Sequence, residues 1–202
     1  MNKHIRSVDM LSLTRKFHKA GFFVHGMFIF CYPHAKNESF KMPIKERARR
    51  YKAFIRKAEI DTVQILLPVP LPGTELRSRL QGQNRIYSPE DIGWEYYDGS
   101  FPLFEPDEPL KSEEIQQNVR KIMGRFYRFG YMFLVPFNIL SFTSLVFFFH
   151  NLRSGFRRWY RPWRNNLIRF GGWTILRKWT TAFRSDTFSQ KLQNARQHLS
   201  HM

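Results

Sequence analysis

Residues 22–30 read Phe-Phe-Val-His-Gly-Met-Phe-Ile-Phe, and Cys31-Tyr32-Pro33 follow directly. Nine residues are too few for a membrane-spanning helix, which needs about 20. An almost unbroken apolar run of this length is typical of a strand buried on both faces, as in parallel sheets. A second buried strand is predicted at residues 62–67, where Pro68 ends the run because proline cannot donate to a strand ladder.

Helical patterns surround the two predicted strands. Residues 8–20 place Met10, Leu13 and Phe17 on one face, and the basic segment 45–56 and a short segment that begins at Thr74 also read as helices. Helices that alternate with strands are typical of a parallel sheet or barrel. We therefore predict an α/β fold that begins with a parallel sheet or barrel. An irregular segment and a helical, basic C-terminal tail follow.

Three regions are expected along the chain. Residues 1–81 contain the alternating helices and strands, and residues 82–129 contain a proline-punctuated stretch and a helix predicted at 112–128. Residues 130–202 carry eleven basic side chains and one acidic one, which is +10 of the chain's net charge of +17.

The stretch 130–150 contains no charged Lys, Arg, Asp or Glu side chain and has the length of a transmembrane helix. Polar residues and Pro136 interrupt it, and both flanks are basic, which leaves its orientation poorly specified. The alternatives are a membrane span, or one or two buried or interfacial helices broken near Pro136. The second is favoured.

Arginines and aromatic residues are interleaved in residues 156–164. This pattern suits nucleic acid, where arginine binds phosphate and aromatic rings stack on bases. It also suits an anionic membrane surface, or packing against the chain's own body. The neighbouring apolar stretch favours a membrane surface over nucleic acid.

Several classes of chemistry are excluded by residue counts and spacings. One cysteine cannot form a disulfide framework, a cysteine-based zinc site or an iron–sulfur cluster. The sequence contains no HExxH, GxSxG, Walker A or GxGxxG pattern. We therefore predict no catalytic residue and no metal site, and we expect the lone Cys31 to be a small apolar filler.

Several motifs, in order, resemble the second half of the radical SAM core. The closest branch is the one whose complete members carry a cobalamin-binding domain ahead of that core. The resemblance covers about residues 2–129, and its motifs are Gly26–Pro33, Glu38–Phe40, Ile60–Gln64, Pro70–Leu76, Trp94–Gly99, Phe104–Pro106 and Arg125–Tyr127.

The resemblance implies cofactors that this chain cannot hold alone. Complete members bind a [4Fe–4S] cluster through CxxxCxxC, and S-adenosylmethionine binds the fourth iron for radical methylation or rearrangement. This chain lacks CxxxCxxC. The resemblance therefore implies that residues 1–81 are a partial (half) β/α barrel with parallel strands, and that the N-terminal half is encoded upstream or supplied as a separate partner. A half barrel leaves a strand edge and an apolar interior open, so we expect the chain either to be a fragment of a larger gene product or to need a complementing partner. The chain alone is then expected to be inactive and to bind neither cluster, cobalamin nor S-adenosylmethionine stably.

The resemblance also implies which residues contact S-adenosylmethionine at the carboxyl ends of the strands. Cys31 stands where similar chains carry glycine, which departs from the pattern. Substrate contacts are implied at Tyr97 and Asp98. The implied cofactor-binding residues are Ile29, Cys31, Tyr32, Pro33, Leu67, Pro68, Pro72, Gly73 and Thr74.

The alternative is a non-catalytic, membrane-associated basic interaction protein that acts through residues 130–202. A nucleic-acid binder is a weaker third hypothesis. No apolar signal-peptide core follows Met1, so we expect a cytoplasmic protein, with membrane association through 130–202 as the alternative to a fully soluble one.

Overall fold

A computed structural model describes residues 6–34, 42–150, 152–183 and 186–200. The predicted motif Glu38–Phe40 lies outside the described residues. The fold is mixed, 64% helical, with a parallel sheet of two strands. The coarse prediction of a helix-and-sheet protein with parallel strands is thereby confirmed.

The chain forms two compact units that each combine distant segments. The first contains Met1–Gly26, Arg50–Gln64 and Ile122–Lys178, and the second contains Met27–Arg49, Ile65–Lys121 and Trp179–Met202. Each unit takes segments from all three regions expected from the sequence.

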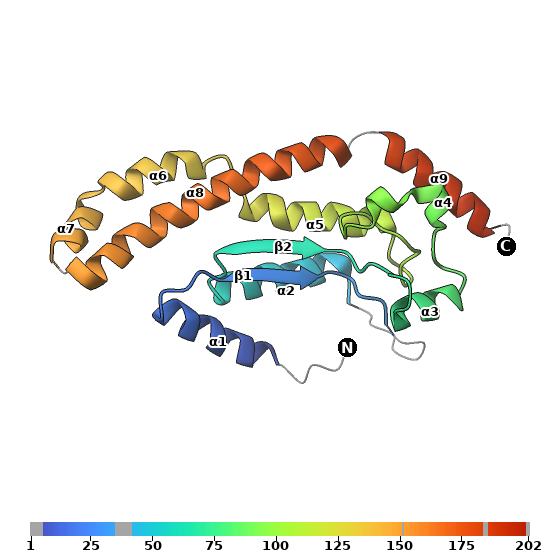
Figure 1. Cartoon of the computed structure of the whole chain (residues 1–202), viewed down its shortest axis with the longest axis horizontal. Helices are drawn as coiled ribbons and strands as arrows, with labels where there is room; N and C mark the ends of the chain where they lie inside the picture. Colours follow the sequence, from blue (N-terminus) through green and yellow to red (C-terminus); the bar gives the residue numbers. More distant parts are fainter. Residues whose placement is uncertain (1–5, 35–41, 151, 184–185, 201–202) are drawn as a thin grey trace. The chain divides into compact units, whose positions relative to one another are not determined.

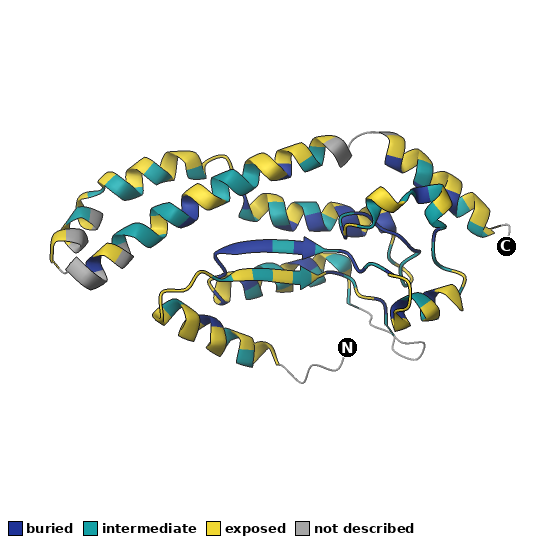
Figure 2. Cartoon of the chain, viewed as in Figure 1, coloured by how far each residue is buried: buried dark blue, intermediate teal, exposed yellow. Residues whose placement is uncertain are grey.

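The two strands lie side by side and point the same way (Figure 1): β1 is His25–Ile29 and β2 is Thr62–Leu66. β2 is mostly buried, as predicted. The prediction that the first strand is buried on both faces is wrong, because β1 exposes alternate residues, with Met27 64% exposed (Figure 2). The described part of the chain therefore leaves apolar side chains of β1 uncovered.

A side chain occupies the outer edge of β2. The backbone N–H of Thr62 donates to Val24 O, so the backbone groups of Thr62 face β1. Successive residues of a strand face opposite sides, so the backbone N–H and C=O of Val63 point away from β1. The Tyr127 hydroxyl accepts a hydrogen bond from Val63 N at 2.8 Å and donates one to Val63 O at 2.7 Å. This edge of the sheet is therefore closed at Val63.

The three helices predicted around the strands are confirmed. They are α1 (Ser7–Lys19), α2 (Ile44–Lys57) and α3 (Glu75–Gln81). The capping residue of α1 is Arg6, whose backbone N–H donates to Asp9 at 3.0 Å. The apolar stripe of α1 is exposed, at 43% for Met10, 45% for Leu13 and 49% for Phe17.

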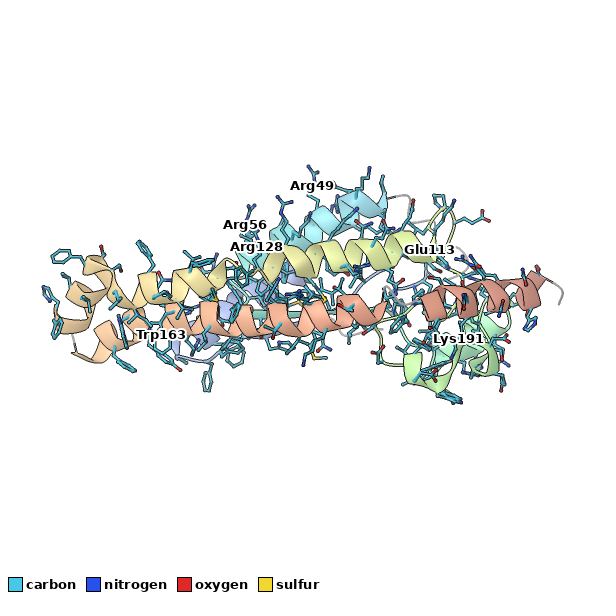
Figure 3. The ribbon with its side chains drawn as sticks, turned by 90° about the horizontal axis from the view of Figure 1, so that it is seen from above. Arg49, Arg56, Glu113, Arg128, Trp163 and Lys191 are labelled. Carbon is cyan, nitrogen blue, oxygen red and sulfur yellow. The ribbon has the colours of Figure 1, made fainter. Side chains whose placement is uncertain are left out.

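α2 separates apolar from basic side chains as its sequence predicts. Ala48 and Ile55 are buried, and Figure 3 shows Arg49 and Arg56 extending away from the ribbon. The basic side chains therefore form a solvated face.

The second unit has a core that joins its middle segment to the end of the chain. α4 (Pro89–Ile92), the 3-10 helix η1 (Trp94–Tyr96) and α9 (Asp186–Ser200) surround it, and α5 (Ser112–Phe126) confirms the helix predicted at 112–128. The buried members of the core are Tyr87, Ile92, Phe101, Leu103, Phe188, Leu192 and Ala195.

The apolar stretch 130–150 forms two short helices, α6 (Tyr131–Leu140) and α7 (Phe142–His150). The break falls at the extended Ser141, five residues after the predicted break, and Pro136 lies inside α6. The long helix α8 (Leu152–Phe183) follows, and α6 and α7 run back along its first part, within the first unit (Figure 1). We call α6, α7 and α8 as far as Lys178 the helical arm.

No helix in the described part of the chain is both long enough and apolar enough to cross a membrane.

Candidate functional site

The loops that follow β1 and β2 leave the sheet at the same edge, because the strands are parallel. The first loop contains Cys31, Tyr32 and Pro33, and the second runs from Leu67 to Thr74. All nine residues implied as cofactor contacts lie on or next to these loops, in the second unit. Ligands of parallel α/β sheets bind at this edge.

Cys31 has a backbone conformation that favours glycine. Its φ is 55°, in the left-handed region, where a Cβ atom crowds the following carbonyl. The Arg47 guanidinium lies 3.9 Å from its sulfur. Burial raises the pKa of the Cys31 thiol to about 11, although Arg47 opposes the rise. The thiol is therefore protonated near neutral pH and is a poor nucleophile.

Arg79 of α3 holds the first loop in place. Its Nη2 donates to Pro33 O at 3.0 Å, and its guanidinium lies 6.0 Å from the centre of the Tyr32 ring. The next residue, His34, donates its backbone N–H to Asp107 at 2.9 Å. The loop after β1 is thus fixed to α3, the helix that the loop after β2 leads into.

The second loop has a buried beginning and an exposed end. Leu67 and Pro68 are buried, whereas Pro72, Gly73 and Thr74 are exposed. Gly73 has a φ of +77°, and the Thr74 hydroxyl caps α3 by accepting from Arg77 N at 3.3 Å. Among the nine implied residues, this exposed end and Ile29 and Tyr32, at 42% and 40% exposed, offer the most surface to a ligand.

A tight turn brings the implied substrate contacts next to the second loop. Leu67 N donates to Gly99 O at 2.7 Å, and a Cβ atom on Gly99 would lie 3.3 Å from the Leu66 side chain. Asp98 and Gly99 lie in this turn, where glycine permits the close approach to Leu66. Asp98 accepts a hydrogen bond from Ser100 N at 2.7 Å, and Tyr97 is partly buried.

A buried carboxylate in the first unit received no role from sequence reasoning. Asp61 is 1% exposed and accepts hydrogen bonds from Val24 N at 2.8 Å and from the Asn165 side chain. His18 Nε2 lies 2.9 Å from it and Arg161 Nη2 lies 3.7 Å from it. Its partners come from residues 18 to 165, so no local spacing reveals the cluster.

The charge of Asp61 is stabilised inside the unit. Burial alone would raise the pKa of Asp61, but the hydrogen bonds from Val24, His18 and Asn165 outweigh burial and hold that pKa below its ordinary value. The carboxylate is enclosed by its own partners, and the His18 side chain is only 7% exposed. This arrangement stabilises the fold and gives a substrate no access.

A second polar cluster, in the second unit, was also missed. The Tyr87 hydroxyl donates to Glu105 at 2.7 Å, and Arg196 of α9 binds both Glu105 and Glu113. Burial, together with the neighbouring Glu105, raises the pKa of Tyr87. Arg196 thus anchors the end of the chain to α5.

Among the described residues, no group of three or more His, Cys, Asp or Glu side chains is placed to hold a metal ion. The chain matches no protein-family model, no curated protein and no solved structure.

Proposed function

We propose that this chain supplies one part of an S-adenosylmethionine site in a barrel of the radical SAM type, cobalamin branch. The supporting observation is the cross-link by Arg79, which ties the loop after β1 to the helix after β2. The two loops that carry the resembling motifs are thereby held at one edge of a parallel sheet. Tyr32 and Leu71, 40% and 48% exposed, offer apolar surface for an adenine ring.

The conformation of Cys31 adds independent support. Chains of the resembling family carry glycine at this position, and the backbone of Cys31 has the positive φ that glycine favours. If the resemblance arose from amino-acid composition alone, nothing would require a positive φ at this particular residue. The loop geometry is therefore the one that a glycine-bearing relative would use.

The remaining strands of the proposed barrel join on the β1 side. Tyr127 occupies the outer edge of β2 at Val63, which opposes strand addition there. Met27 on β1 and the stripe of α1 are exposed apolar surfaces that further strands and helices would cover. In this proposal another polypeptide segment supplies those elements.

The chain's own residues do not fit an iron–sulfur cluster. Such a cluster needs several thiolates, and this chain has one cysteine, whose pKa of about 11 keeps it protonated. The cluster and cobalamin therefore belong to the complementing segment, and the chain's own part is to position S-adenosylmethionine.

Ligand binding by the purified chain tests the proposal. We expect no cluster absorption after anaerobic treatment with iron and sulfide, and S-adenosylmethionine binding on the order of 1 mM by saturation-transfer NMR. The change Arg79→Ala should weaken that binding by releasing the first loop. Arg49→Ala, an exposed arginine paired with Glu46, is the matched control and should bind as the native chain does. A cluster, no binding, or equal binding by both variants would contradict the proposal.

A further inference from the structure

The helical arm exposes two matching rows of large apolar side chains. Phe133, Phe137 and Leu140 on α6 are 62%, 66% and 70% exposed, and Phe142, Val146 and Phe149 on α7 are 82%, 43% and 74% exposed. Each row follows the spacing i, i+4, i+7, which puts its members on one face of the helix. We call these six residues the apolar face.

Contacts with α8 hold α6 and the residues just before it in place. Trp159 Nε1 donates to Ile139 O at 3.1 Å, and the Phe129 ring lies 5.0 Å from the Trp173 ring. α6 contains no buried residue, and most of its large apolar side chains are exposed despite these anchors. On α7, five residues line a hollow of about 480 Å³: Phe142, Leu145, Val146, Phe149 and His150.

Charge is distributed along the arm in a second pattern. The helical arm and the residues just before it (122–178) contain ten Arg and Lys side chains and no Asp or Glu, and none of the ten falls between 129 and 152. Arg128 and Lys178, near the two ends of this segment, are exposed. The arm therefore combines an uncharged apolar face with flanks of a single, positive sign.

We propose that the helical arm binds the surface of an anionic lipid bilayer. The apolar face enters the boundary between headgroups and acyl chains, and the basic flanks contact lipid phosphates. In this proposal the arm lies along the surface of the bilayer. This inference rests on the arm alone and is independent of the proposed S-adenosylmethionine site.

Charge and apolar pattern favour a bilayer over other partners. Single-stranded nucleic acid needs cations beside its stacking rings, and the apolar face has none between 129 and 152. A second copy of the chain would bring together two arms that each lack acidic residues, which repel each other. An anionic bilayer offers both apolar depth and negative charge.

Vesicle flotation with the full chain tests the proposal. Vesicles of phosphatidylcholine with 30% phosphatidylglycerol are compared with pure phosphatidylcholine at about 0.1 M salt, where charges act over about 10 Å. We expect the chain to float with the anionic vesicles, with at least about ten-fold weaker partitioning into neutral ones. Raising the salt to about 0.5 M should reduce binding.

Two double variants separate the apolar face from general apolar exposure. Phe137→Glu with Phe142→Glu should lower anionic-vesicle binding by at least about ten-fold, because carboxylates oppose insertion and the charge of the lipid. Val8→Glu with Met10→Glu makes the same charge change at exposed positions of α1 and should leave binding intact. Circular dichroism of both variants checks that the helices persist.

Three outcomes would overturn the proposal: no flotation with anionic vesicles, equal loss in both double variants, or equal binding to neutral vesicles. A fourth would be a chain that does not bind vesicles but forms a dimer, with the dimer lost only in the double variant at Phe137 and Phe142. That result would assign the apolar face to a second copy of the chain.

Discussion

His18 Nε2 lies 2.9 Å from Asp61 Oδ2, and both side chains are enclosed. This contact joins α1 to the residue that precedes β2. Asn165 of α8 binds the other carboxylate oxygen, and the Arg169 side chain donates to Asp61 O at 3.3 Å. One aspartate thus links three segments of the first unit that are far apart in sequence.

Replacing Asp61 with asparagine should destabilise the chain by about 3 kcal/mol at pH 7, because Arg161 and the hydrogen-bond donors around Asp61 lose a buried negative charge. The pKa of Asp61 is lowered in the folded state, so its stabilisation is present above its ordinary pKa of about 4 and is lost as pH falls through the lower folded value. The difference between native and Asp61→Asn chains should therefore shrink below about pH 4. Urea unfolding at several pH values measures it.

Glu59→Gln is the matched control for this change. Its carboxylate lies 3.9 Å from Arg161, but its side chain is 73% exposed, so the loss should be less than about 1 kcal/mol. Equal losses in the two variants, or a gap that does not shrink as the pH falls below about 4, would contradict the role assigned to Asp61.

Adjacent glycines of α8 should respond to alanine with opposite signs. A Cβ atom on Gly172 would lie 2.5 Å from the Tyr127 ring, whereas Gly171 has open space. Gly172→Ala should cost about 1–3 kcal/mol by displacing the tyrosine that closes the edge of β2. Gly171→Ala should gain about 0.5–1 kcal/mol because alanine is the better helix former. Thermal unfolding of both variants decides, and a gain in both would refute the close packing.

Cys31 should tolerate glycine better than alanine. Alanine removes the sulfur but keeps the Cβ atom at φ 55°, which costs about 1–2 kcal/mol, whereas glycine removes both. Greater backbone freedom of glycine in the unfolded chain offsets about 0.4–1 kcal/mol of this gain. Cys31→Gly should therefore be more stable than Cys31→Ala in chemical unfolding. A less stable glycine variant would show that the left-handed conformation is not populated.

Sequence patterns predicted the local elements well and their surroundings less well. The apolar run 22–30 gave the position of β1, but whether Met27 is covered depends on elements that a local pattern does not contain. The break between α6 and α7 falls at Ser141, since Pro136 is accommodated inside a helix. Periodicity describes a helix or strand, and it carries no information on what packs against it.

The long-range clusters were beyond sequence reasoning for the same reason. Asp61 belongs to the motif Ile60–Gln64, which gives it no role of its own, and its partner Asn165 lies 104 residues away. Phe188 and Leu192 of α9 pack with Tyr87 in one core, although the terminal region reads as a basic tail. The loops after β1 and β2 were easier to place, because parallel strands bring their carboxyl ends together.

Amide NMR of the isotope-labelled chain during titration with S-adenosylmethionine tests the central claim most directly. We expect the amide chemical-shift changes to concentrate in residues 29–34 and 71–74, at the carboxyl ends of β1 and β2. S-adenosylhomocysteine should shift the same amides. The Asp61 cluster and the helical arm should be unaffected. Shifts spread over the basic helices, or none in the two loops at about 5 mM ligand, where a site with a Kd of about 1 mM is mostly filled, would contradict it.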